Sequence, residues 1–294
     1  LACWLLLDRG LRLSRAAWGG FAFGLACLVK PHLIVVPAIL ESVSAFSRRE
    51  PGRAATHARR LLLVYAVLVA VLIPWTVRNY RVFGHLVYVS TNAGNVLYIG
   101  NNPKATGRYI WWQEMSEKVG SGDEYEKDRR ARAAAIEYMR THPVETVRLW
   151  PEKLFRLYYR GDEGIRRNIE GLTGTDLYYQ APREQERILE QADQRSPGRI
   201  RWLRAASFLS QGHYYAMMAT ALAGLVVLWR RRRSGTVLPL HGVLVVLFLA
   251  AVHVVTFAGP RYHLPMIPWI AMYSGAFLAW LFGRDRVWEA GRSP

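Results

Sequence analysis

Cysteine, acidic residues and nucleotide-binding motifs are scarce or missing in this sequence. Its two cysteines, Cys3 and Cys27, lie inside apolar runs without metal-ligand spacing, so we expect buried thiols. No P-loop, GxGxxG or nucleophile motif occurs, which argues against nucleotide chemistry. The sequence has 22 acidic residues and 39 Lys and Arg residues, which gives a net charge of +17. The position of these charges must therefore decide between a nucleic-acid partner and a membrane topology signal.

Apolar and aromatic residues are abundant instead. Hydrophobic residues make up 51% of the 294 positions, yet the mean hydropathy is only +0.02. This combination predicts membrane helices together with a sizeable soluble portion. The chain starts at Leu1 within an apolar run and lacks the basic segment and cleavage site of a signal peptide. We expect it to be the downstream part of a longer protein.

Several apolar runs approach the length of about 20 residues that a membrane-spanning helix needs. Residues 205–229, 237–258 and 262–282 meet it comfortably, and residues 61–77 meet it marginally. Residues 16–46 form either one helix that contains Lys30 or two short helices hinged at Lys30-Pro31.

Fifteen of the 39 basic residues cluster in four short connections between these runs. They are Arg9, Arg12, Arg15, Arg48, Arg49, Arg53, Arg59, Arg60, Arg230 to Arg233, Arg284, Arg286 and Arg292. The positive-inside rule places such connections in the cytoplasm. All four share one side only if residues 16–46 form a hairpin, so we favour the hairpin. The predicted domains are transmembrane helices in 1–78, an external domain in 79–204, three transmembrane helices in 205–283 and a cytoplasmic tail in 284–294.

The external domain holds 17 of the 22 acidic residues, so most of the net charge is a topology signal and we expect no nucleic-acid partner. Residues 82–109 predict short extended segments with turns at 83–84, 92–95 and 100–103. Helices are predicted at 123–140, 144–159 and 182–194. The expected fold class is therefore mainly α, a polytopic integral membrane protein with a mixed α/β outer loop domain.

One cation occupies each outward-facing helix junction: Lys30 before Pro31, Arg78 in PWTVRNY and Arg261 in GPRYHLP. Ionisable residues at membrane depth are costly and usually face a cavity or a partner. Lys and Arg also bind phosphate, so the three cations together would suit a lipid phosphate or pyrophosphate. The alternative is that each side chain snorkels to the interface.

Other polar candidates carry weaker signals. His263 follows Tyr262 at the same junction and would either exchange a proton with a sugar hydroxyl or serve the structure. His241 and His253 lie on nearby faces of one helix without a third ligand, so we assign no metal site to them. The sequence indicates no cofactor. It does not decide whether the protein requires a divalent metal. The acidic residues of the external domain show no special pairing, which favours a solvated surface. They are Glu114, Glu117, Asp123, Glu124, Asp162 and Glu163.

Three stretches in this order resemble the family-39-like glycosyltransferases of bacterial membranes, distant relatives of protein O-mannosyltransferases and lipid A aminoarabinose transferases. They are GFAFGLACLVKPHLIVVPAIL, PWTVRNYRVFGHLVYVSTNAGNVLYIGNNPKATGRY and GPRYHLPMIPWI, of which the second is the most specific. The resemblance covers the whole chain as the C-terminal two-thirds of such a protein. It implies a GT-C fold in which an acceptor hydroxyl attacks a polyprenyl-phosphate-linked sugar. In that family the catalytic carboxylate lies in the first external loop, which is expected upstream of Leu1, so no catalytic residue is assigned here.

A leaving polyprenyl phosphate needs cations at the outer level of the bilayer, so we expect the donor phosphate site at the junction cations Lys30, Arg78 and Arg261. Sugar or acceptor contacts are expected from Asn79, Asn92, Asn95, Asn101, Tyr262 and His263. Residues 90–109 would cap the external side of the cavity, or they are ordinary turns that fold the outer domain. The expected partners are the lipid donor and the membrane, with an unknown acceptor, at the outer face of a bacterial inner membrane. The rival functions are a transporter or flippase of lipid-linked glycans and a non-catalytic membrane scaffold.

Overall fold

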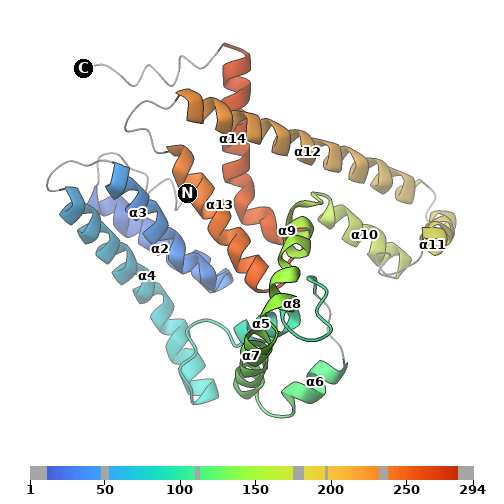
Figure 1. Ribbon diagram of the computed structural model, residues 1–294, viewed down its shortest axis with the longest axis horizontal. Helices are drawn as coiled ribbons and strands as arrows, with labels where there is room; N and C mark the ends of the chain where they lie inside the picture. The colour runs from blue at the N-terminus through green and yellow to red at the C-terminus, as the bar shows by residue number, and fades with distance from the viewer. Residues whose placement is uncertain are drawn as a thin grey trace. The chain divides into compact units, whose positions relative to one another are not determined.

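The structure is a computed structural model that describes residues 12–47, 53–109, 113–174, 182–195, 198–231 and 238–283. These residues are mainly helical, and no β-strand occurs among them (Figure 1). The chain forms two compact units. The first contains Leu1–Leu154 and Leu228–Ala258, and the second contains Phe155–Val227 and Gly259–Pro294.

Within the described ranges, three helices are long and apolar enough to cross a membrane. They span Ala54–Phe83, Arg199–Arg230 and Pro260–Leu281, and they correspond to the predicted runs 61–77, 205–229 and 262–282. The run 237–258 instead forms α13 (Leu238–Val255), whose apolar part covers only Leu240–Val255. These helices are consistent with a membrane protein.

The first unit has the apolar helices α2 (Leu13–Val29), the 3-10 helix η1 (Pro31–Val35), α3 (Val36–Ser47) and α4 (Arg53–Phe83), and it also contains α13. Two glycines four residues apart bring α2 against α4 (Figure 1). A Cβ atom on Gly20 would lie 2.5 Å from the Val64 carbonyl oxygen, and one on Gly24 would lie 2.7 Å from the Val71 Cβ. Glycines at this spacing share one helix face and allow close packing of membrane helices.

The chain reverses direction between α2 and α3. Arg60, near the start of α4, donates hydrogen bonds to Glu41 in α3 and to the carbonyl oxygen of Arg12, which directly precedes α2. The start of α2 and the middle of α3 therefore lie near the same end of α4. The reversal takes place at Lys30, where α2 has ended and η1 has not begun.

The first unit also contains the apolar α5 (Ala93–Gly100), the more polar α6 (Gln113–Val119), α7 (Glu124–Thr141) and α8 (Pro143–Arg148), and the start of α9 (Trp150–Tyr158). The predicted helix 123–140 is confirmed as α7, with Asp123 as its N-cap. The predicted helix 144–159 is divided into α8 and α9. Residues 82–109 do not form the predicted extended segments: α4 continues to Phe83, and α5 is a helix. The described part of the outer region is thus helical rather than α/β.

The second unit contains the rest of α9, α10 (Glu163–Thr173), α11 (Pro182–Arg195), α12 (Arg199–Arg231) up to Val227, the 3-10 helix η3 (Pro260–Met266) and α14 (Ile267–Leu281). The predicted helix 182–194 is confirmed as α11. A small apolar core of Ile169, Ala192, Ile200 and Leu203 joins α10, α11 and α12. A hydrogen bond of 2.7 Å between the hydroxyls of Thr220 and Ser274 joins α12 to α14.

Candidate functional site

The first candidate feature is the helix break at Lys30. The Lys30 backbone is extended, with φ −137° and ψ 92°, although its N–H still bonds to the Ala26 carbonyl oxygen at 2.8 Å. Pro31 follows and begins η1. A proline cannot donate to a continuing α-helix, and its ring disfavours helical backbone at the preceding residue. The sequence Lys-Pro thus ends α2 and leaves a half-buried amine at the turn.

Two histidines lie at this break. The rings of His32 and His253 have centroids 6.0 Å apart and meet edge to face. Lys30 is within electrostatic range of both rings. The Nε2 atom of His32 is buried without a hydrogen-bond partner. We call Lys30, His32 and His253 the basic hinge cluster.

Sequence reasoning did not find the histidines of this cluster. It paired His253 with His241, but His241 bonds to the Ser44 hydroxyl at 2.8 Å instead. The available signal was that His32 follows Lys30 by two residues at a predicted hinge. In the described part of the chain no group of three or more His, Cys, Asp and Glu side chains is placed to hold a metal ion.

Arg78 and Asn79 lie near the end of α4 in the same unit. The exposed Arg78 guanidinium donates to Asn79 Oδ1 at 3.0 Å and lies over the Trp75 ring. Asn79 is buried, and its Nδ2 donates to the carbonyl oxygens of Val87 and Val89, each at 3.1 Å. Both amide hydrogens therefore hold the chain after the Gly84 turn against α4 and are not free for a sugar.

The stretch 90–109 is organised around α5. The buried Asp128 of α7 accepts hydrogen bonds through Oδ1 from the N–H groups of Gly94 at 2.6 Å and Asn95 at 3.1 Å. These are amides of the first helical turn, which have no partner within the helix. Asn92 is exposed, whereas the Oδ1 atom of Asn95 is buried without a partner.

Backbone contacts at both ends of α5 require glycine. A Cβ atom on Gly94 would lie 1.9 Å from the Asp128 carbonyl oxygen, and one on Gly100 would lie 1.9 Å from that of Thr256. The glycines and asparagines of this stretch thus fix a short helix against α7 and the end of α13. This arrangement favours the structural interpretation of the cluster.

Replacing Asp128 with alanine is expected to lower the free energy of unfolding by about 1–2 kcal/mol, because two helix N–H groups lose their acceptor. Chemical unfolding followed by circular dichroism would measure this loss. Glu117→Ala, at an exposed carboxylate, is the control and should stay within about 0.5 kcal/mol of wild type. Equal stability of the two variants would contradict the assigned role of Asp128.

Asn101 and Lys153 form a buried pair beside α5. The Asn101 amide nitrogen donates to the carbonyl oxygens of Leu97 and Val255, both at 2.8 Å. Its Oδ1 accepts a long hydrogen bond of 3.5 Å from Lys153 Nζ. The Lys153 side chain is 0% exposed, and burial lowers its pKa to about 8. The amide nitrogen and oxygen of the Asn101 side chain are thus both hydrogen-bonded within the protein and stabilise the fold.

In the second unit, η3 carries the remaining predicted site residues. Arg261 is exposed; its guanidinium donates to the Tyr262 hydroxyl at 2.7 Å and lies over the same ring. His263 is buried, and its Nδ1 donates to the Leu157 carbonyl oxygen at 2.8 Å. The Tyr214 ring lies 5.0 Å from the His263 ring, centroid to centroid. The Arg261 side chain is thus exposed, whereas the His263 side chain is buried and links η3 to α9 through its hydrogen bond to Leu157.

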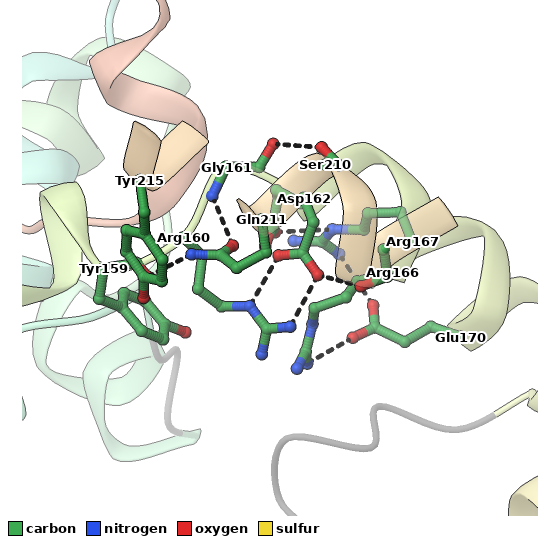
Figure 2. Close-up of polar contacts among 12 residues, drawn as sticks. Tyr159, Arg160, Gly161, Asp162, Arg166, Arg167, Glu170, Ser210, Gln211 and Tyr215 are labelled. Carbon is green, nitrogen blue, oxygen red and sulfur yellow. Dashed lines mark hydrogen bonds and ion pairs between the residues drawn. The ribbon is translucent and has the colours of Figure 1, made fainter. Parts of the chain in front are cut away.

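A polar network fixes the segment after α9 on α12 (Figure 2). Asp162 accepts two hydrogen bonds from Arg160, both at 2.7 Å, and one from the Ser207 hydroxyl. Burial alone would raise the pKa of Asp162, but the hydrogen bonds from Arg160 and Ser207 outweigh it, and the pKa is lowered. The solvated position expected for Asp162 is wrong: its side chain is buried and holds the fold.

Comparisons with protein-family models, with curated proteins and with solved structures find no match for this chain. Function must therefore be argued from the groups themselves. Lys30 and Arg78 belong to the first unit and Arg261 to the second. Their convergence on one phosphate stays a prediction, whereas Lys30, His32 and His253 form a cluster within one unit.

Proposed function

We propose that this protein is an integral-membrane glycosyltransferase. It would move a sugar from a polyprenyl-phosphate-linked donor to an acceptor hydroxyl at the outer face of a bacterial inner membrane. The observation that carries the proposal is the gathering of Lys30, His32 and His253 at a helix break. Lys binds phosphate as a point charge and imidazole N–H groups can donate hydrogen bonds to it, so a phosphate, with its opposite charge, suits this cluster.

The proposed reaction places negative charge where this cluster can stabilise it. The acceptor oxygen forms a bond to the anomeric carbon while the bond from that carbon to the phosphate oxygen breaks. The departing lipid phosphate gains charge, and a fixed amine with two imidazoles lowers the energy of that charge in a water-poor site. Arg78 and Arg261 would add to the same role if they meet the donor.

Replacing Lys30 with alanine in the full-length protein tests the proposal. Transfer from a radiolabelled polyprenyl-phosphate sugar in membrane vesicles should fall by about 10²-fold, since fixed groups that stabilise developing charge contribute on that scale. Arg140→Ala removes an exposed cation of α7 and should leave the rate unchanged. Transfer at the wild-type rate by Lys30→Ala would overturn the phosphate assignment. Movement of intact donor across the membrane without transfer would favour a flippase.

A further inference from the structure

Residues 143–154, which run from α8 into α9, carry an exposed apolar face within the first unit. Pro151 has no N–H group to donate to the Val147 carbonyl oxygen, which explains why α8 and α9 are separate helices. Leu149 lies between them and keeps right-handed helical backbone, so side chains three and four positions apart still share a side. Four apolar residues on this side are each at least 39% exposed: Val144, Val147, Trp150 and Leu154. We call these four residues the α8–α9 face.

The other sides of the same segment are buried or polar. Thr146 and Lys153 are buried in the first unit. Glu145 is exposed, and because successive helical residues are about 100° apart it lies on the opposite side of the helix from Val147. The segment is therefore amphipathic, but its apolar side faces outward. A contiguous apolar surface of this kind marks an interaction site.

Two contacts hold this segment beside the end of the apolar helix α13. Asn101 accepts the 3.5 Å hydrogen bond from Lys153 and donates to the carbonyl oxygen of Val255, the last residue of α13, at 2.8 Å. The Gly107 carbonyl oxygen accepts the N–H of Ala258 at 2.9 Å, and a Cβ atom on Gly107 would lie 3.3 Å from Lys153 Cγ. The α8–α9 face therefore belongs to a segment that packs near the point where α13 ends.

α13 runs in the same direction as the candidate membrane span Ala54–Phe83. His241, near the start of α13, bonds to the Ser44 hydroxyl of α3, and Glu41 of α3 bonds to Arg60 near the start of α4. The starts of α13 and α4 thus lie at one end of these helices, and their last residues lie toward the other. An apolar helix that crosses a bilayer ends near the headgroups, so the segment lies where a headgroup layer is expected.

The residues of the face and its border have the chemistry of a membrane interface. Trp150 combines a large apolar ring with an N–H group, a combination that is enriched where hydrocarbon meets water. Arg148 is exposed next to Val147 in the sequence, and no ion pair joins it to another residue in the described part of the chain. An apolar helix face bordered by a basic residue suits the surface of a bilayer with anionic headgroups.

We propose that the α8–α9 face lies in the lipid headgroup layer at the end of α13, with its apolar side chains toward the acyl chains and Arg148 on an anionic headgroup. The bilayer is thus the partner that covers this face. The proposal rests on the membrane-spanning helices and not on the glycosyltransferase assignment, because it uses neither a sugar donor nor the basic hinge cluster.

Spin labels on the full chain in vesicles of phosphatidylcholine and phosphatidylglycerol test this placement. The label is attached through Val147→Cys or Glu145→Cys in a chain whose Cys3 and Cys27 are replaced by alanine, with circular dichroism to verify the fold. Power saturation with oxygen and with a water-soluble nickel chelate measures the depth of each label. We expect the label at Val147 about 5–10 Å into the boundary between headgroups and acyl chains, and the label at Glu145 in water.

The two label positions are a matched pair, since both residues are exposed and lie on opposite sides of the same helix. The proposal is overturned if the nickel chelate reaches the label at Val147 as readily as the label at Glu145. It is also overturned if oxygen and nickel are both excluded at Val147, because a protein surface, either the second unit or another copy of the chain, then covers the face.

Arg148→Ala tests the anionic headgroup. At a salt concentration where docked and undocked populations of the Val147 label are both visible, the variant should lower their ratio about fivefold in vesicles rich in phosphatidylglycerol. This corresponds to about 1 kcal/mol for one basic residue near an anionic surface. In vesicles of phosphatidylcholine alone the ratio should not change. An unchanged ratio in both lipids would overturn the role of Arg148.

The outcome of these measurements is separate from that of the transfer assay. The vesicles contain no sugar donor, so a failure of the membrane placement leaves the Lys30→Ala result unaffected. Retained transfer by Lys30→Ala would likewise leave the depth of the Val147 label unaffected.

Discussion

Replacing Glu41 with alanine is expected to lower the free energy of unfolding by about 3–5 kcal/mol, since it leaves a buried charge without its partner. Glu41 is 2% exposed and accepts hydrogen bonds from Arg60 Nε at 3.1 Å and from His57 Nδ1 at 2.7 Å. Arg60 is 0% exposed. Through the Arg12 carbonyl oxygen it also holds the start of α2, so the loss should affect the packing of α2, α3 and α4 together.

Chemical unfolding in detergent micelles would measure this effect. Glu190→Ala, at an exposed carboxylate of α11, serves as the control and should change stability by no more than about 0.5 kcal/mol. The double variant Glu41→Leu with Arg60→Leu should recover most of the loss, because an apolar pair often replaces a buried ion pair at little cost. A single variant as stable as the control would show that the ion pair does not hold these helices.

This ion pair also shows what charge counting along the sequence can and cannot predict. Arg60 was counted with Arg59 and Arg53 as a cytoplasmic topology signal, yet it is wholly buried against Glu41. Glu41 directly follows an apolar run and gave no sign of a partner 19 residues away. Which charges in a basic connection face water depends on how the helices cross, and a one-dimensional charge pattern does not contain that information.

Elements set by local chemistry were predictable. Pro31 ends α2 at Lys30, and Asp123 caps α7, because in each case the deciding group lies within three residues of the boundary. The segment around α5 was not predictable in the same way. Its Gly and Asn residues read as turns, and only the carboxylate of Asp128 and the close contacts of Gly94 and Gly100 make it helical.

The residues of the candidate site were likewise predictable only where the signal is local in the sequence. Lys30 was identifiable because an isolated cation beside a proline interrupts an apolar run. His253 joins it from α13, more than 200 residues further along the chain, and this pairing requires the fold. Asn79 and Asn101 matched the composition of a sugar site, yet the structure uses their amide hydrogens on the backbone. Asparagine content alone does not separate the two roles.

The stability of the protein is expected to rise by about 2.5 kcal/mol between pH 7 and pH 10 through Lys153 alone. Burial lowers the pKa of Lys153 from 10.5 to about 8 in the folded protein. Between these two values the unfolded chain binds more protons than the folded chain, so the free energy of unfolding increases with pH. Below pH 8 the folded protein holds a charged amine that is 0% exposed and that, among the described residues, donates one long hydrogen bond to Asn101 Oδ1.

The variant Lys153→Met isolates this contribution, because methionine fills a similar volume without a titrating group. The difference in unfolding free energy between wild type and Lys153→Met should shrink steadily from pH 7 to pH 10. Other titrating groups, such as Tyr158, whose pKa burial raises to about 12, cancel in that difference. Lys118→Met, at an exposed lysine, should keep the pH dependence of wild type. A difference that stays constant across this range would mean that the Lys153 amine reaches water in the folded protein.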